Sequence, residues 1–460
     1  MYRKNAWLTC SAEKKEAVFA FAEQYKHFIS DCKTERECVS FMVEEIRQHG
    51  YRDINEVLAA NEAIHPQDKL YLNWMGKALM MFHIGERGLD EGMNILGAHI
   101  DSPRIDLKQN PLYEEAELAM LDTHYYGGVK KYQWLALPLA LHGVVVKKDG
   151  TVIDLKIGEE MNDPVLGLSD LLIHLSADQL EKKARVVVEG ETLNVLVGSL
   201  PLIGEDKEAV KAYLLQLLQN EYGIEEEDFV SAELELVPAG AARDYGLDRS
   251  MVMGYGHDDR ICAYPSYQAL LAVEQADYTN VCLLVDKEEI GSVGATGMTS
   301  RVFENTVAEI LFAMGKKEDI YVRRAMQRSV MLSSDVSAAF DPNFPEVMEK
   351  KNSAFFGYGM TFNKYTGSRG KSGSNDANAE YMARLRRVMD EEEIAYQTAE
   401  LGKVDQGGGG TIAYILAEYG MEVIDSGVAV LNMHAPWEIA SKIDIFETYR
   451  GYVAFLQQIR

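Results

Sequence analysis

The chain has 460 residues, is 47% hydrophobic and carries a formal net charge of −26. Phosphate groups bind to clustered Lys and Arg, so this charge argues against nucleic acids and anionic membrane surfaces as partners. The five cysteines are scattered and include no CxxC pair, which argues against a disulfide framework. Without a signal-peptide core or a membrane-length apolar segment, the sequence predicts a cytoplasmic protein.

Helical periodicity predicts two helices near the N-terminus, at 12–30 and 34–49. Strands are expected next, within YLNWMGKALMMFHIG (71–85) and NILGAHI (94–100). The sequence pattern changes after Leu107, where the alternation of predicted helices and strands stops. A KKDG turn between two alternating segments predicts a β-hairpin. ARVVVEGETLNVLVGSLPL (184–202) predicts two more short strands, and a helix is expected around 206–220.

The α/β pattern returns from about Met251, with further helices expected at 259–276, 298–316, 375–393, 409–420 and 437–459. We therefore predict an α/β catalytic domain with a mixed central sheet flanked by helices. It is formed by two parts of the chain, 1–107 and 241–460, with a mostly β domain, 108–240, inserted between them.

Four segments each contain an apolar run that is followed by an acidic residue or a histidine. They are NILGAHIDSPR (94–104), NVCLLVDKEEIGSVG (280–294), RSVMLSSDVSAAF (328–340) and GVAVLNMHAPWE (427–438). Each run predicts a buried strand of about five residues. In open α/β sheets, ligands bind beyond the carboxyl ends of the strands, so the polar ends of these runs are predicted to converge.

The first two runs carry residues suited to metal chemistry. Alternate residues of an extended segment face the same way, so His99 can bind a metal while Asp101 fixes its tautomer. The alternative is a surface histidine beside an acid. Glu288 and Glu289 point in different directions, so one can bind a metal while the other acts as general base towards a water. The alternative is a solvated acidic turn.

A third acidic motif, HDD (257–259), opens a helix and can supply a carboxylate that bridges two metals. The residues alone leave the choice among His257, Asp258 and Asp259 open. Asp335 and His434 follow the other two apolar runs, and each by itself is more often structural. Together the set contains nitrogen and oxygen donors without thiolates, which suits zinc, manganese or cobalt in a two-metal site with a bridging water.

The motifs GAHIDSPR, GHDDR, DKEEIGS, SSDVSAA and NMHAPWE, within residues 15–455, resemble the aspartyl aminopeptidase / aminopeptidase I family of zinc metallopeptidases. The resemblance implies a phosphorylase/hydrolase-like catalytic domain with an inserted β-rich dimerisation domain. It also implies two divalent ions per subunit, most simply zinc, and removal of N-terminal residues from peptides with a free N-terminus. A tetrahedral dodecamer built from dimers is implied as well.

The resemblance also implies roles for individual residues. It makes Glu288 the general base and Asp101 the acid that orients His99. It implies a cis peptide bond between Asp258 and Asp259. The implied metal ligands are His99 and Asp335 for the first metal, Asp258 as the bridge, and Glu289 and His434 for the second metal.

Further residues are implied around the metals. His174 resembles a histidine given to a neighbouring subunit's active site, where it would stabilise the tetrahedral intermediate; the alternative is a buried structural histidine. Lys364 aligns with a lysine that can meet an acidic substrate side chain, and Gly408 and Gly409 align with a turn beside the substrate. Leu135-Ala136-Leu137 replaces an expected polar run, so acidic and neutral N-terminal residues both remain open as preferred substrates.

Two other functions would also account for these observations. A related metallo-carboxypeptidase or N-deacylase would share the metal set, and substrates with blocked and free N-termini separate it from an aminopeptidase. A non-catalytic scaffold or cargo-binding protein would bind no stoichiometric metal. The motif GSRGKS (367–372) is rejected as a phosphate-binding loop because Tyr365 stands where its first glycine is required.

Overall fold

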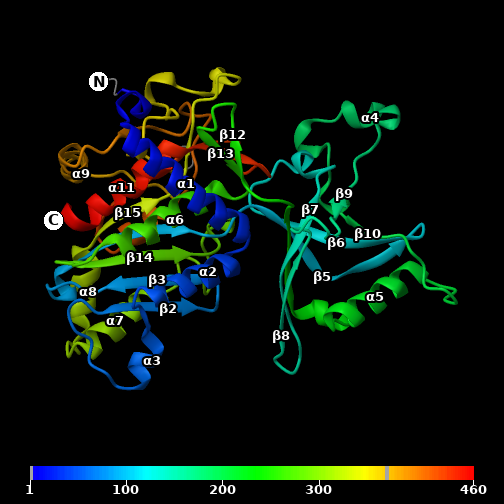
Figure 1. Cartoon of the computed structure of the whole chain (residues 1–460), viewed down its shortest axis with the longest axis horizontal. Coiled ribbons are helices and arrows are strands. Elements are labelled where there is room, and N and C mark those ends of the chain that lie inside the picture. The colour runs from blue at the N-terminus through cyan, green and yellow to red at the C-terminus, as the bar shows by residue number, and fades with distance from the viewer. Residues whose placement is uncertain (1–3, 368–371) are drawn as a thin grey trace. The chain divides into compact units, whose positions relative to one another are not determined.

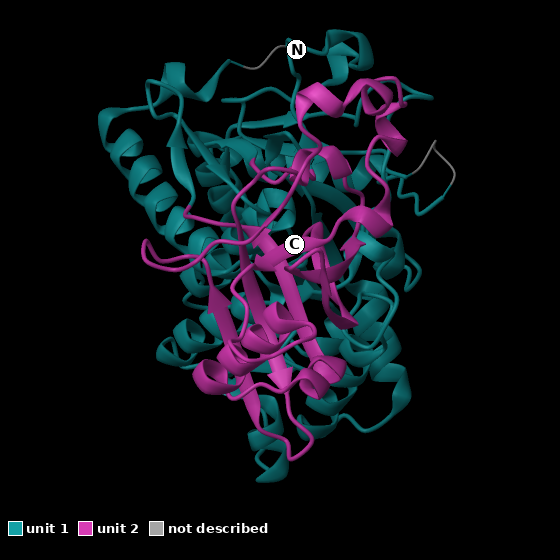
Figure 2. Ribbon diagram, turned by 90° about the vertical axis from the view of Figure 1, so that its right-hand side faces the viewer, with its two compact units in different colours: residues 1–101, 242–433, 438–460 teal, residues 102–241, 434–437 magenta. Residues whose placement is uncertain are grey.

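The protein is described by a computed structural model that covers residues 4–367 and 372–460; most of the rejected GSRGKS motif lies outside these residues. The chain divides into two compact units (Figure 2). Unit 1 comprises Met1–Asp101, Ala242–Met433 and Glu438–Arg460, and unit 2 comprises Ser102–Ala241 and His434–Trp437.

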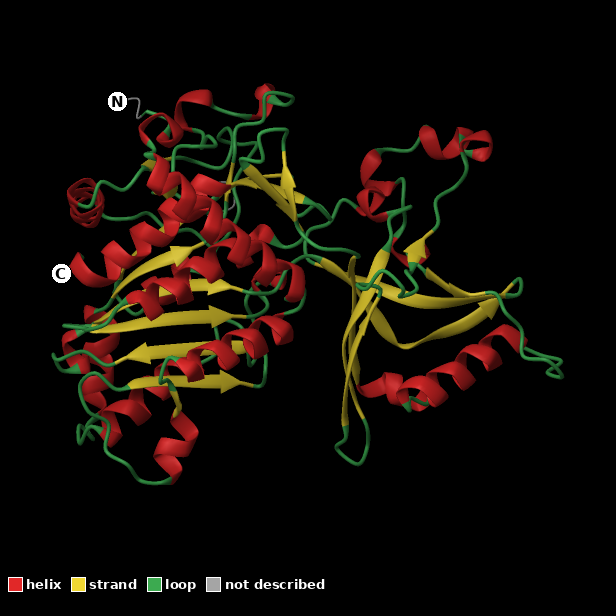
Figure 3. Ribbon diagram, in the orientation of Figure 1, coloured by secondary structure: helices red, strands yellow, loops and turns green. Residues whose placement is uncertain are grey.

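Unit 1 is built on a mixed sheet that has nine strands within the described residues (Figures 1 and 3). Its central strands β14, β4, β15 and β19 are parallel, while β3 and β17 join them antiparallel on either side. The strands, in sheet order, are β1 (Arg52–Asp53), β2 (Lys69–Trp74), β3 (Ala78–His83), β14 (Thr279–Val285), β4 (Met93–His99), β15 (Val330–Ser334), β19 (Glu422–Gly427), β17 (Met360–Asn363) and β18 (Tyr396–Thr398).

Helices cover both faces of this sheet. Successive side chains of a strand point to opposite faces, so strands that are apolar throughout need a covering layer on each side. On β4, for example, Leu96 packs into one apolar cluster and Ile95 into another. The first cluster contains residues of α1 (Ala12–Asp31), α2 (Glu35–Gln48), α6 (His257–Ala272), α9 (Ala379–Glu391) and α11 (Lys442–Gln458). The second contains residues of α3 (Ile54–Ala59), α7 (Val302–Ala313), α8 (Asp319–Arg328) and α10 (Ala413–Ala417).

Local chemistry sets the ends of the predicted N-terminal helices, which are confirmed. The Ser11 side chain accepts a hydrogen bond from the Lys14 amide at the start of α1. Thr34 and Glu37 form a capping box at the start of α2. The predicted helix at 409–420 is shorter than expected, because the Gly-rich segment before α10 is not helical. Helices α3 and α8 were not predicted.

A second sheet in unit 1, five-stranded within the described residues, corrects one expectation. The fourth apolar run forms β20 in this sheet and not in the central one. Strand β20 pairs parallel to β16 and antiparallel to β21. The strands, in order, are β12 (Arg243–Tyr245), β13 (Met251–Gly254), β21 (Glu438–Ser441), β20 (Ala429–Leu431) and β16 (Ser337–Ala338).

Unit 2 is mainly a sheet, seven-stranded in the part of the chain that is described, with α5 (Ala209–Tyr222) and a short α4 (Ala177–Leu180). The predicted hairpin is confirmed as β7–β8. Only one of the two strands expected in 184–202 forms; Ala184–Val186 is a 3-10 helix in which Val186 is exposed. The strands, in order, are β8 (Val152–Ile157), β7 (Leu139–Val146), β11 (Ala232–Pro238), β5 (Arg104–Glu115), β6 (Leu118–Tyr126), β10 (Val195–Gly198) and β9 (Gly167–Leu168).

No helix in residues 4–367 or 372–460 is both long and apolar enough to cross a membrane.

Candidate metal centre

Three of the four apolar runs end side by side. Strand β4 lies between β14 and β15 and runs parallel to both, with His99 in register with Val285 of β14. Parallel neighbours bring their carboxyl ends to one edge of the sheet. The end of β4, the turn after β14 and the residue after β15 therefore meet, as the apolar pattern predicted.

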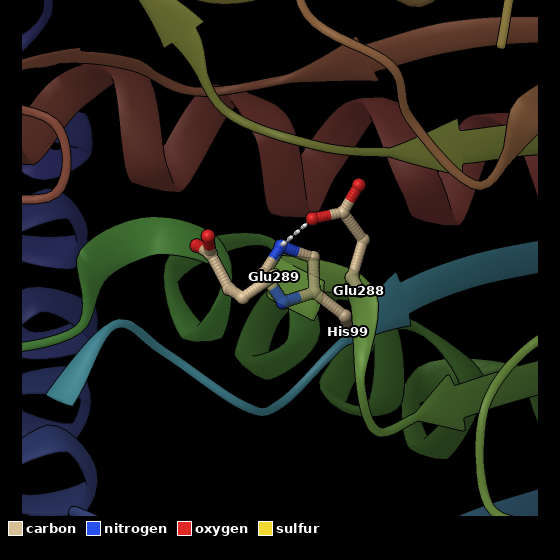
Figure 4. Close-up of side chains that lie close together, drawn as sticks. All are labelled: His99, Glu288 and Glu289. Atoms are coloured by element: carbon tan, nitrogen blue, oxygen red, sulfur yellow. Dashed lines mark ion pairs between the residues drawn. The ribbon is translucent and has the colours of Figure 1, made fainter. Parts of the chain in front are cut away.

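His99, Glu288 and Glu289 form the first group of side chains at this edge (Figure 4). One potential ligand atom from each lies within 4.8 Å of the others. His99 is 1% exposed, and its Nε2 is 3.9 Å from Glu288 Oε2. Lys287, just before the two glutamates, has a φ of 69°, a conformation that is uncommon outside glycine. This backbone turns both carboxylates out of the line of β14.

Asp101 links the histidine to the glutamate turn and is fully buried. Its Oδ1 accepts a hydrogen bond from the Glu288 amide and its Oδ2 one from the Glu289 amide, both at 3.2 Å. His99 Nδ1 lies 3.2 Å from Asp101 Oδ1 and 3.0 Å from the Asp101 carbonyl oxygen. These contacts leave His99 Nε2 facing the carboxylates, which is the orientation that metal binding needs.

Asp258 and Asp335 form a second group with His99, again with ligand atoms within 4.8 Å of one another. Asp258 Oδ1 lies 3.3 Å from His99 Nε2. The peptide bond between Asp258 and Asp259 is cis, which confirms the expectation from the resemblance. The buried Glu438 accepts a hydrogen bond of 3.0 Å from the Asp258 amide and so helps to place this carboxylate.

The electrostatics of the group favour a cation. Burial, and then the charges of Asp259 and Glu288, raise the pKa of Asp335 well above its ordinary value. Burial lowers the pKa of His99, but hydrogen bonds with Asp101 and Asp258 outweigh it and hold that pKa well above its ordinary value. The raised pKa of His99 reports the negative charge of the carboxylates around it, while that of Asp335 reports first its burial and then its acidic neighbours. The residues therefore fit a divalent metal, which would offset this charge through nitrogen and oxygen ligands.

His434 belongs to the short segment that clusters with unit 2. Its φ is 66°, and its Nδ1 lies 3.0 Å from the Gly128 carbonyl oxygen. A side chain at Gly128 would come within 3.2 Å of the same nitrogen, so glycine permits the contact. The role of His434 as a ligand stays a prediction.

The remaining predicted residues lie on surface segments. His174 is exposed on a 3-10 helix (Ile173–Leu175) of unit 2, so the alternative of a buried structural histidine is wrong. Lys364 Nζ contacts Tyr365 Oη at 2.8 Å and Asp376 Oδ1 at 3.2 Å. Gly408 and Gly409 are exposed just before α10. Their substrate contacts stay predictions.

Sequence reasoning gave no role to Glu438, and it considered Asp259 only as an alternative to Asp258 as the bridging carboxylate. Glu438 closes the NMHAPWE motif, so its acidic side chain was a visible signal. Asp259 Oδ2 lies 3.4 Å from the His99 amide nitrogen and accepts its hydrogen bond. No spacing in the sequence indicates that contact, because it joins residues 160 positions apart.

Nitrogen and oxygen donors at the strand ends of an α/β unit are the groups that metal-dependent hydrolases use to hold their metals. A model of the family described as aminopeptidase I zinc metalloprotease (M18) matches residues 28–456. The chain therefore belongs to the M18 family of zinc metalloaminopeptidases, which are hydrolases that act on peptide bonds.

Relatives support this placement over the full length. A Clostridium acetobutylicum protein called probable M18 family aminopeptidase 1 is 63% identical over 454 residues, or 98% of each chain. The solved aminopeptidase I from C. acetobutylicum has a TM-score of 0.93, with 62% identity over 99% of this chain and 100% of that one. An M18 aminopeptidase from Thermotoga maritima has a TM-score of 0.95, with 44% identity over 100% of both chains. The α/β fold is thus the fold of the family.

Proposed function

We propose that this chain removes N-terminal residues from peptides with a two-metal site, and that Glu288 is its general base. The observation that carries the proposal is the presence of His99 in two of the candidate ligand groups, with Glu288 and Glu289 in one and Asp258 and Asp335 in the other. Carboxylates and an imidazole gathered at one point can hold a divalent metal and leave one carboxylate to act as base towards a water.

The residues that would hold the metals are those that the family resemblance implies. They are His99 and Asp335 for one metal, Asp258 between the two, and Glu289 and His434 for the other, with Asp101 orienting His99. When bound, zinc, or manganese or cobalt in its place, would act as a Lewis acid on the scissile carbonyl and would acidify water. No ligand in this set is a thiolate, which is consistent with all three metals.

Glu288 then has two proton transfers to perform. As the carboxylate, it takes a proton from the attacking water, and it returns this proton to the amine that leaves when the peptide bond breaks. Its placement supports this role, because Asp101 holds the Glu288 amide and fixes the turn that aims the side chain. The free α-amino group of the substrate would be recognised at the acidic cluster, which accounts for a requirement for an unblocked N-terminus.

Glu288→Gln tests the proposal. If Glu288 is the base, the variant keeps its metal content and loses about 10³-fold or more in kcat, because the amide cannot accept the proton. If Glu288 is instead a ligand, metal content falls with activity. Glu289→Gln is the comparison, since it should lose metal, and Glu86→Gln, on the surface, should behave as wild type. Wild-type turnover in Glu288→Gln would contradict the assignment.

The same proposal covers metal and substrate preference. Wild-type enzyme loaded with zinc, manganese or cobalt would be assayed on peptides that begin with Asp, Glu, Leu, Met or Lys, with N-acetylated peptides as controls. Hydrolysis only of free N-termini supports an aminopeptidase. Hydrolysis of blocked peptides or of amides from the C-terminus supports the carboxypeptidase or deacylase alternative.

We also propose that the β-rich insertion, 108–240, mediates self-association into dimers and a tetrahedral dodecamer, and that His174 completes the active site of a neighbouring subunit. Exposed apolar side chains near His174 in the sequence support this, because exposed apolar patches mark contact surfaces. They are Leu172 (54% exposed), Ile173 (69%), Leu175 (67%) and Leu180 (66%). A monomeric mass in light scattering would contradict the oligomer.

A further inference from the structure

A buried carboxyl group that the mechanism does not use lies beneath two loops of unit 1. Asp425, on β19, is 1% exposed. The Ser333 hydroxyl donates a hydrogen bond to its Oδ1 at 3.0 Å, and the Thr366 hydroxyl donates to its Oδ2 at 3.2 Å. The Thr411 hydroxyl also interacts with this carboxyl group and lowers its pKa. Hydroxyl groups from three segments that are distant in the sequence thus act on one carboxyl group.

Each of these hydroxyl groups stands beside a residue of the proposed site. Ser333, on β15, is two positions before the candidate ligand Asp335, and it is in register with Asp425 of β19. Thr366 is two positions after Lys364. Thr411 is two positions after Gly409 and opens the segment that leads into α10.

Other contacts join the two loops directly. The Gly367 amide donates a hydrogen bond to the Gly409 carbonyl oxygen at 2.8 Å. The Asn375 amide donates to the Thr366 hydroxyl at 3.3 Å, and the Asn375 side-chain amide donates to the Val423 carbonyl oxygen of β19 at 2.9 Å. Thr366 is therefore both a partner of Asp425 and a contact within its own loop.

As a carboxylate, Asp425 is suited to hold several hydroxyl groups in fixed positions. A carboxylate has no donor and about four acceptor positions, so it can take three hydroxyl groups at once. Burial raises its pKa to about 6, while the hydrogen bonds from Thr411, Ser333 and Thr366 oppose that rise. At neutral pH the group is thus an ionised acceptor, and such hydrogen bonds are the stronger kind. Loss of any one of these hydrogen bonds leaves the buried carboxylate with fewer donors, which is unfavourable.

We propose that Asp425 is a positioning residue of the enzyme, which holds the segments of Lys364 and of Gly408–Gly409 against β15 so that they meet the substrate in one fixed arrangement. This inference rests on the proposed function, which places the substrate at these segments. Asp425 acts through its hydroxyl partners and touches neither substrate nor metal in this scheme.

Asp425→Asn is the direct test. Asparagine keeps the shape but offers one oxygen acceptor and an amide donor, so it cannot accept three hydroxyl groups. We expect KM for a dipeptide substrate to rise about 10-fold and kcat to change less than about 3-fold, because substrate placement is impaired more than proton transfer. Metal content at saturating zinc stays at the wild-type level.

Matched variants separate positioning from general stability. Asp444→Asn also removes a buried carboxyl group, but one whose partners are the Gly357 and Gly359 amides. It should keep the wild-type KM even where it lowers the melting temperature. Thr411→Val should reproduce the KM effect of Asp425→Asn, and Thr411→Ser, which keeps the hydroxyl, should restore the wild-type KM.

A readout independent of activity distinguishes this inference from the proposed function. Hydrogen exchange followed by mass spectrometry should be faster around Gly367 and at 407–411 in Asp425→Asn but not in Asp444→Asn. Wild-type KM and exchange in Asp425→Asn, or equal effects in both variants, would overturn the proposal. If wild-type protein hydrolyses no peptide, the proposed function fails while the exchange result still decides the role of Asp425. If Asp425→Asn does not fold, Thr366→Val and Thr411→Val decide it by the same measurements.

Discussion

At the scale of single residues, Asp101 has the most consequential contacts of the proposed site. Its buried carboxylate contacts the His99 ring and accepts hydrogen bonds from the amides of Glu288 and Glu289. Two candidate ligands, His99 and Glu289, and the candidate base Glu288 thus depend on a residue that need not touch the metal. Outer contacts of this kind hold metal ligands in their binding orientation.

Asp101→Asn should therefore lower metal affinity by about 10–100-fold, a typical effect of losing such a partner. The asparagine amide would face a backbone N–H where the carboxylate accepted one, so the glutamate turn loses a hydrogen bond. Zinc affinity, measured by competition with a chelator, checks this expectation. Asp277→Asn, at an exposed ion pair with Arg87, is the control and should bind zinc as wild type does. Unchanged affinity in Asp101→Asn would contradict the role.

The predictability of these residues follows from how local their contacts are. His99 and Asp101 could be predicted together because alternate residues of a strand end face the same way. The contacts of Glu438 and Asp259 could not be predicted, because each accepts a hydrogen bond from a backbone amide far away in the sequence. Asp425 lies within a buried strand and belongs to no motif, so nothing in the sequence indicated that it holds hydroxyl groups of other segments.

At the scale of elements, the approach of β19 to the end of β15 leaves no room for a side chain. A Cβ at Gly427 would lie 2.2 Å from the Asp335 carbonyl oxygen and 2.7 Å from Cys262 Sγ. Backbone that close cannot move aside cheaply, so glycine is required here for a close approach. The strand pairing itself thus sets where Asp335 sits.

Gly427→Ala should consequently destabilise the fold by about 1–3 kcal/mol, as over-packing does, and also reduce zinc affinity by displacing Asp335. Denaturant unfolding and zinc titration measure the two effects. Gly198→Ala is the control, because on β10 the added Cβ would meet its neighbours at ordinary contact distances of 3.8 and 3.9 Å. If the two variants are equally stable and bind zinc equally, the steric argument is wrong.

A second element, the start of α11, makes stability depend on pH. Burial raises the pKa of Asp444 to about 8, against the opposing hydrogen bonds of the Gly357 and Gly359 amides. In the unfolded chain the pKa of this carboxyl group is about 3.9. Between these values the folded protein holds one more proton than the unfolded chain, so the contribution of Asp444 to stability falls as pH rises.

The free energy of unfolding of wild type, minus that of Asp444→Asn, should therefore decrease between pH 5 and pH 8. The slope is about 1 kcal/mol per pH unit, because only the wild type loses this contribution. Urea unfolding at several pH values measures the difference, and the shared titrations of other groups largely cancel in it. A difference that is flat or rises with pH would contradict the raised pKa.

The central sheet could be predicted further than the smaller one, and for a physical reason. Strands β4, β14 and β15 are continuous apolar runs, as expected of parallel strands buried on both faces. Strand β20 has a similar apolar run, but its antiparallel pairing with β21 and its pairing with β16 place it in another sheet. Such pairings depend on the whole chain, and no local pattern separates them from pairing in the main sheet.

At the scale of the whole molecule, the proposed oligomer makes a prediction that no monomer can satisfy. If His174 acts in a neighbouring subunit while Glu288 acts in its own, His174→Ala and Glu288→Gln damage different partners of each site. A mixed dimer then has one intact site, with His174 from the Glu288→Gln subunit and Glu288 from the His174→Ala subunit. Random pairing of equal amounts gives intact sites at about one quarter of the wild-type number.

Co-expression of the two variants with different affinity tags, followed by sequential purification of the mixed oligomer, tests this directly. We expect each variant alone to be nearly inactive and the mixed oligomer to recover a large part of the expected activity. A double variant that carries both changes on one subunit, paired with wild type, is the control for subunit exchange. Mixed oligomers of confirmed composition that show no recovery would place His174 outside the neighbouring active site, because residues that share one subunit cannot complement in this way.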